Sequence, residues 1–330
     1  MSIFSSPLLA NLPVSSFAMV MGLSGLALVW GRVANMGWLP GWAPLLAKAF
    51  GLLACAVFVL LLVLYLKKMV SRGQDVLAEW HHPVKSAFFA AVAVSFALIG
   101  AICLGLFAPL ALPIWAVGAL LQLIIMVMVL NAWIHREGLQ PAHANPAWFI
   151  PAVANVVIPL GGVGLGYIEI SWWFFAVGIL FWVVMLTVVM GRLLFVQPPM
   201  PERLTPTLCI LLAPPAVGFL SWMLLTGQHP DGRPIDVTGH ILFGITLFFA
   251  IFLASQIRHF MRLPFFLSWW AFSFPVAAFT AATLVYSRFV DSPWMTALAA
   301  LMLGLSTLLI IWLLLRTVVA VVRHEPQLVD

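Results

Sequence analysis

The sequence predicts an all-α integral membrane protein with ten transmembrane helices, arranged as five helical hairpins. Three observations support this prediction: the composition, the spacing of the apolar segments, and the way proline and glycine alternate between them. Of the 330 residues, 64% are hydrophobic and only 8% are charged, whereas soluble domains average about 25% charged residues. So few charged residues cannot cover a water-facing surface, and the alternating ten-residue pattern of an outer-membrane barrel is absent.

Ten apolar segments are long enough to cross a bilayer, which takes about 20 residues in a helix. They cover residues 12–32, 44–66, 84–108, 111–135, 148–167, 170–195, 205–226, 237–258, 264–287 and 293–317. Of the fifteen Lys and Arg residues, only four fall on one side of this arrangement: Arg32, Lys48, Arg233 and Arg288. The positive-inside rule therefore places the other side, with both chain termini, in the cytoplasm. Because the cations lie between the spans, the net charge of +5 reflects topology and predicts no nucleic-acid partner.

Proline and glycine divide the segments into two kinds. The odd-numbered segments carry them deep inside, whereas the even-numbered segments keep proline at their start or lack it. A pair of one broken and one smooth helix thus recurs five times along the chain. Broken helices are tolerated in membranes where neighbours or water satisfy the freed carbonyl groups. We therefore predict an inner ring of five odd helices around a central pore, wrapped by five smooth helices that face lipid.

Small residues follow one face of the odd segments at helical spacing. The predicted pore-lining residues are Ser15, Ala18, Gly22, Ser86, Ala90, Ala93, Ala97, Asn155, Pro159, Gly162, Ala213, Ala216, Ala277 and Ala278. Small stripes are also typical of helices that pack closely against each other. The sequence leaves both interpretations open.

Polar chemistry is scarce within the spans. No Asp, Glu, Lys or Arg lies in the middle of an odd segment, and the three cysteines have no metal-ligand spacing. We therefore expect no metal site, no cofactor and no enzymatic activity. The odd helices all start on the cytoplasmic side, so their positive dipole ends converge there. Lys85 and His82 are predicted to lie at this cytoplasmic mouth, where positive charge favours anions, although Lys85 is also a normal topology signal.

Four motifs resemble the tellurite-resistance/dicarboxylate transporter family, which includes bacterial TehA proteins and plant slow-type anion channels. The motifs occur in order along the chain: "EWHHPVKSAFF" (79–89), "WFIPAVANVVIP" (148–159), "LAPPAVGFLSW" (212–222) and "WWAFSFPVAAF" (269–279). The resemblance implies a homotrimer in the bacterial inner membrane, with one anion-conducting pore in each protomer. It also implies a gate formed by a phenylalanine of the ninth helix, which corresponds to Phe274.

Phe274 also differs from its neighbours by helical angle. Phe265, Phe272 and Phe279 form one stripe, whereas Phe274 points about 200° away from Phe272, toward a face of small residues. It lies about 15 Å along the helix from Pro264, close to the bilayer midplane. Pro275 lacks an N–H group, so the helix can bend there and the sequence predicts a hinge. The alternative is an aromatic side chain that fills the core at a kink.

The sequence and the resemblance together predict a channel for small inorganic or organic anions, gated by Phe274. The alternative is a secondary carrier or exporter for a C4-dicarboxylate such as malate, for sulfite or for tellurite.

Overall fold

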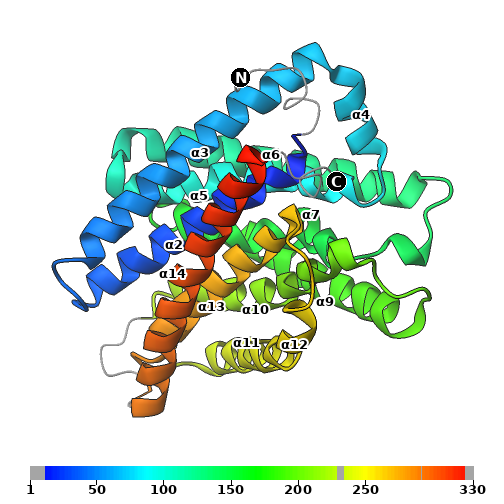
Figure 1. Ribbon diagram of the computed structural model, residues 1–330. Coiled ribbons are helices and arrows are strands. Elements are labelled where there is room, and N and C mark those ends of the chain that lie inside the picture. The colour runs from blue at the N-terminus through cyan, green and yellow to red at the C-terminus, as the bar shows by residue number, and fades with distance from the viewer. Residues whose placement is uncertain (1–11, 229–233, 291, 324–330) are drawn as a thin grey trace.

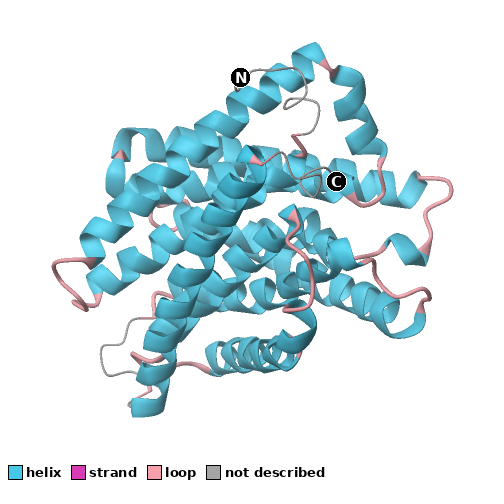
Figure 2. Cartoon of the chain, viewed as in Figure 1, coloured by secondary structure: helices cyan, strands magenta, loops and turns pink. Residues whose placement is uncertain are grey.

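The computed structural model describes residues 12–228, 234–290 and 292–323, and within these ranges every regular element is a helix (Figures 1 and 2). The predicted all-α membrane fold is confirmed, because nine stretches of the described chain are long and apolar enough to cross a bilayer. Arg233 and both chain ends, whose sides of the membrane were predicted, lie outside these ranges.

The even-numbered segments are long, uninterrupted α-helices. They are α3 (Ala43–Ser71), α6 (Ala108–His135), α9 (Ile168–Phe195), α11 (Val237–Ser255) and α14 (Pro293–Val322). Only 28% to 33% of the most apolar stretch of each helix is buried. Figure 1 shows α3, α9, α11 and α14 around the outside of the molecule. Large apolar side chains therefore remain exposed along these helices, as expected for surfaces in contact with lipid.

Four of the odd-numbered segments begin as a 3-10 helix and continue as an α-helix. They are η1 (Val14–Phe17) with α2 (Ala18–Asn35), η2 (Lys85–Phe89) with α5 (Ala90–Leu106), η6 (Glu202–Leu212) with α10 (Ala213–Leu225), and η7 (Leu267–Phe272) with α13 (Ser273–Tyr286). Between 72% and 83% of their most apolar stretches is buried. Pro214 and Pro275 lie in the first turn after the change, where a missing N–H group is tolerated.

The fifth segment differs from the single helix predicted over residues 148–167. It consists of four short pieces: η4 (Pro146–Trp148), α7 (Phe149–Val153), η5 (Ala154–Val157) and α8 (Pro159–Gly162). Pro151 and Pro159 remove two backbone donors, and Gly161 and Gly162 disfavour a continuous helix further. This broken segment is buried among the other odd segments.

The contacts among the odd segments run in a closed order. α2 contacts α5, α5 contacts η5 and α8, both of these contact α10, α10 contacts α13, and α13 contacts α2. Glycine permits the closest approach between α2 and α13, because a Cβ atom on Gly22 would collide with the side chain of Ser273. The hairpin of α5 and α6 is equally close: a Cβ atom on Gly100 would lie 2.7 Å from the backbone nitrogen of Trp115.

Two short helices were not predicted as separate elements. α4 (Gly73–His81) follows α3 directly, and α12 (Ile257–Phe260) follows α11. α4 has an apolar and a polar side but is only nine residues long, so it could not be recognised among the membrane spans. It positions the segment that leads from His82 into η2.

Candidate functional site

Three cavities follow one another among the odd segments. The first, which we call the vestibule, has a volume of about 290 Å³ and is lined by Pro13, Val14, Ser15, Glu79, His82, Val84, Lys85, Phe88, Pro201, Arg203, Leu204 and Ser268. It shares Ser15, Phe88 and Ser268 with a narrow cavity of about 70 Å³, which we call the first chamber. A second chamber of about 430 Å³ lies beyond and shares Val217 and Phe274 with the first. The shared walls place the three cavities in series.

Phe274 forms part of the wall between the two chambers. Its side chain is 7% exposed and lines both cavities. Gly25 of α2 faces the ring, and a Cβ atom added there would lie 3.3 Å from Cδ2 of Phe274 and 3.0 Å from Cβ of Ala277. Because Gly25 has no side chain, the ring of Phe274 can pack directly against α2 at this point.

Hydrogen bonds hold the backbone in place just before Phe274, where η7 ends. Ser273 donates a hydrogen bond from Oγ to the carbonyl oxygen of Trp270 at 2.6 Å. The indole of Trp270 donates to Oγ1 of Thr317 at 2.9 Å, which ties η7 to α14. Pro275, the predicted hinge, lines the first chamber one residue after Phe274. The ring thus lies where a 3-10 helix meets an α-helix.

Apolar side chains dominate the first chamber. Besides the indole of Trp270, its polar side chains are the hydroxyls of Ser15, Thr207 and Ser268. The hydroxyls of Thr207 and Ser268 donate to carbonyl oxygens of Leu204 and Arg203. At about 70 Å³, the first chamber is the smallest of the three cavities. Narrow apolar passages of this kind block ions by excluding water.

Five of the fourteen predicted lining residues lie on the chamber walls. Ser15, Ala18 and Ala213 line the first chamber, and Ala277 and Ala278 line the second. The other nine line none of the three cavities: Gly22, Ser86, Ala90, Ala93, Ala97, Asn155, Pro159, Gly162 and Ala216.

Several of these nine lie in contacts between helices. The backbone of Ala93 and Ala97 lies directly against Gly118 of α6, and Gly162 lies against Trp115 and Ser171. Small residues serve two purposes in these segments, and helical spacing alone does not separate the wall of a cavity from a packing contact.

The vestibule holds two basic side chains and one carboxylate. Lys85, which was predicted at this mouth, is joined there by Arg203 and by Glu79. Neither Glu79 nor Arg203 was predicted at this mouth. Glu79 does lie in the first of the four motifs, whereas Arg203 precedes the third by nine residues.

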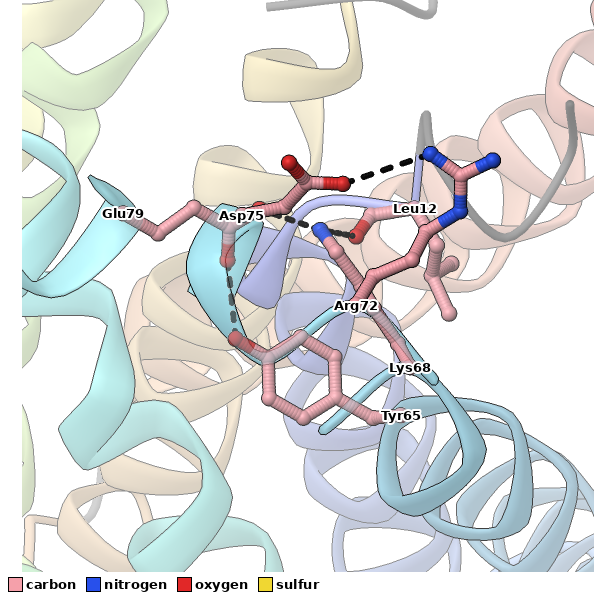
Figure 3. Close-up of polar contacts among 6 residues, drawn as sticks. All are labelled: Leu12, Tyr65, Lys68, Arg72, Asp75 and Glu79. Carbon is pink, nitrogen blue, oxygen red and sulfur yellow. Dashed lines mark hydrogen bonds and ion pairs between the residues drawn. The ribbon is translucent and has the colours of Figure 1, made fainter. Parts of the chain in front are cut away.

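A buried lysine neutralises this carboxylate (Figure 3). Nζ of Lys68 lies 2.6 Å from Oε1 of Glu79 and donates a second hydrogen bond to the carbonyl oxygen of Leu12 at 2.8 Å. The hydroxyl of Tyr65 donates to Oε2 of Glu79 at 2.8 Å. The side chains of Lys68 and Glu79 are only 1% and 11% exposed. Because Glu79 is paired and hydrogen-bonded, it adds little negative potential to the vestibule.

His82, the second predicted mouth residue, lines the vestibule and holds the start of η2. Its Nδ1 accepts hydrogen bonds from the backbone N–H groups of Val84 and Lys85 at 3.1 Å and 3.2 Å. Partial burial, followed by the charges of Lys85, His143 and Arg136, lowers the pKa of His82 from its usual value. Because Nδ1 acts as the acceptor, the neutral form of His82 carries its proton on Nε2.

Two cations that were predicted only as topology signals line the second chamber. Arg32 of α2 and Lys48 of α3 line it together with small and apolar residues, and no Asp or Glu lies on its described wall. In the described parts of the chain, no group of three metal-ligating side chains is present. The first chamber offers hydroxyl groups, and the second chamber offers positive charge.

The comparisons with known proteins agree on one family. The family described as SLAC1, voltage-dependent anion channel, matches residues 11–318. The S-type anion channel SLAH3 of Arabidopsis thaliana is 25% identical over 95% of this chain, and the chain spans about half (49%) of its length. An uncharacterized transporter of Methanocaldococcus jannaschii, MJ0576, is 28% identical over 71% of this chain and 72% of its own. The TehA tellurite-resistance homolog of Haemophilus influenzae is 26% identical over 83% of this chain and 81% of its own length.

Proposed function

Because the chain belongs to the SLAC1 family of voltage-dependent anion channels, we propose that it conducts small anions through the vestibule and the two chambers, and that Phe274 gates this pathway. The observation that carries the proposal is the position of Phe274, the one aromatic residue on the walls of both described chambers. An ion passing from one chamber to the other must pass this ring and Val217.

The charges at both ends of the pathway support an anion over a cation. Lys85 and Arg203 line the vestibule, Arg32 and Lys48 line the second chamber, and Glu79 is neutralised by Lys68. Basic groups at a channel mouth concentrate anions there. The predicted orientation places the vestibule in the cytoplasm and the second chamber on the outer side of a bacterial inner membrane. We further propose a homotrimer with one pathway in each protomer.

The Phe274→Ala variant tests the gate. Removing the ring joins the two chambers, so the anion conductance in planar bilayers should rise at least about tenfold over wild type, which corresponds to a barrier lower by about 1.4 kcal/mol. Saturable uptake without unitary currents would instead indicate a carrier.

Phe272→Ala is the matched control. Phe272 lies two residues away, is equally buried at 9% exposed, and packs edge-on against Phe260 at 4.9 Å between ring centres. It lines none of the three cavities. If both variants conduct equally, the current arises from loosened packing, and the gate assignment to Phe274 fails.

A further inference from the structure

The basic side chains of the second chamber form a pair whose charges are unbalanced. Arg32 lies in the last turn of α2 and Lys48 near the start of α3, and both line the same cavity of about 430 Å³. Within the described part of the chain, neither side chain makes a hydrogen bond or an ion pair. Two cations line this cavity and no described carboxylate does, so the cavity carries an excess of positive charge that a bound anion would balance.

The surroundings of the pair suit a small anion. The rest of the described wall consists almost entirely of small and apolar residues, among them Gly31, Ala277 and Ala281. Apolar walls lower the local dielectric constant and strengthen the attraction between a cation and an anion. Pro44 and Ala47, in the first turns of α3, also line the chamber, so the positive end of a 29-residue helix lies at the same cavity.

We propose that Arg32 and Lys48 form an anion-binding site in the second chamber, which loads small monovalent anions such as nitrate or chloride into the cavity that Phe274 borders. Arg32 is the main ligand, because its guanidinium group is partly buried, whereas Lys48 is exposed and contributes mainly charge. This inference rests on the proposed function and adds a site at the end of the pathway opposite to Lys85.

The alternative is that Arg32 only complements the carbonyl groups at the end of α2, as basic residues in a last turn commonly do. Arg288 supplies the matched control for it. Arg288 is an exposed arginine just beyond the end of α13 and lines none of the three cavities. The sequence predicts it on the same side of the membrane as Arg32.

The electrical test uses Arg32→Gln, Lys48→Gln and Arg288→Gln, each combined with Phe274→Ala. At about 20 mM salt, Arg32→Gln should lower the current carried by anions that enter from the second chamber about threefold or more. Lys48→Gln should lower it less, and Arg288→Gln should leave it unchanged. In 1 M salt, where the screening length falls to about 3 Å, the differences should largely disappear. Equal currents in Arg32→Gln and Arg288→Gln at low salt would overturn the site.

A binding test that needs no conduction separates this proposal from the gate. Nitrate is exchanged for gluconate at constant ionic strength with the purified full-length protein, and the thermal unfolding midpoint is measured. Nitrate should raise Tm by about 2 °C or more in wild type and in Arg288→Gln, because a ligand that binds only the folded state stabilises it. Arg32→Gln should lose this rise. If Arg32→Gln keeps it, the site is wrong even when Phe274→Ala conducts; if only the conduction fails, the gate is wrong and the binding site stands.

Discussion

Glu79 places a carboxylate on the vestibule wall, and Lys68 makes that carboxylate compatible with anions. The ion pair is buried, and Tyr65 and the carbonyl of Leu12 complete its hydrogen bonds. The same contacts hold α4 against the end of α3, so the pair also fixes the chain that leads into His82 and η2. Charge neutralisation and positioning can be separated by mutation.

Lys68→Met should both destabilise the protein and reduce anion current. The free energy of unfolding should fall by about 3 kcal/mol, because removal of one partner leaves a buried charge unpaired. With Phe274→Ala, the low-salt anion current should also fall, since Glu79 then carries an unbalanced negative charge. Adding Glu79→Gln should restore the current. Unfolding midpoints measure the loss of stability, and bilayer currents measure the loss of conduction. If the double variant carries no more current than Lys68→Met, the ion pair acts only through folding.

The histidine at the vestibule gives a pH prediction at the same scale. Because the pKa of His82 is lower in the folded protein than in the unfolded chain, its contribution to stability is complete above about pH 6.5. This contribution is lost as pH falls through the folded-state pKa, when protonated Nδ1 can no longer accept from Val84 and Lys85. The side chain is exposed, so the effect is small.

His82→Asn is the variant that isolates this effect. The asparagine oxygen can accept the same backbone hydrogen bonds, as it does at helix starts, but it does not titrate. The drop in Tm between pH 7 and pH 5 should therefore be smaller in His82→Asn than in wild type. An identical drop in both proteins would assign the acid sensitivity to other groups.

Single residues differ in how far the sequence predicts their place in the fold. Helical angle separates Phe274 from the Phe272 stripe, and its role as a gate stays a prediction. Arg32 and Glu79 could not, because a loop cation and a loop carboxylate give no sign of the cavity they line until the chain is folded. The pore assignments of Gly22 and Ala97 illustrate a second limit: a small residue suits a cavity wall and a close helix contact equally well.

At the scale of elements, the 3-10 starts of the odd segments are the feature that distinguishes them from the even helices. A 3-10 helix rises about 2.0 Å per residue rather than 1.5 Å and leaves its hydrogen bonds less regular. In this structure the change to α-helix falls at Ala18, Ala90, Ala213 and Ser273. Proline and glycine positions predicted that the odd segments were irregular, but they did not predict this form, because it depends on packing among all five.

Glycine contacts within a hairpin give a prediction at this scale. Gly100 and Gly105 both lie on α5, but only Gly100 lies against the backbone of α6. Gly100→Ala should lower the free energy of unfolding by about 1–3 kcal/mol, because the added methyl group forces α5 and α6 apart. Gly105→Ala has open space around its Cβ position and should be neutral or slightly stabilising. Unfolding midpoints of the two purified variants check this, and equal losses would contradict the role of close packing.

At the scale of the whole molecule, the all-α membrane fold, the family and the alternation of buried and lipid-facing helices were all predictable from sequence. Composition and segment length predict the all-α membrane fold. The alternation follows because broken helices need protein neighbours for their free carbonyl groups. The closed order of contacts from α2 through α13 arises from long-range packing. The series of three cavities also required the folded chain, because their walls combine residues from all five odd segments.

The central claim is that this series of cavities is an anion pathway closed at Phe274, and the reversal potential of Phe274→Ala channels tests it most directly. In a tenfold chloride gradient across a planar bilayer, the current should reverse close to the Nernst potential of the anion, about 59 mV in magnitude. Wild type should carry little current under the same conditions. A reversal potential near zero or of cation sign, or a Phe274→Ala protein as silent as wild type, would contradict the account.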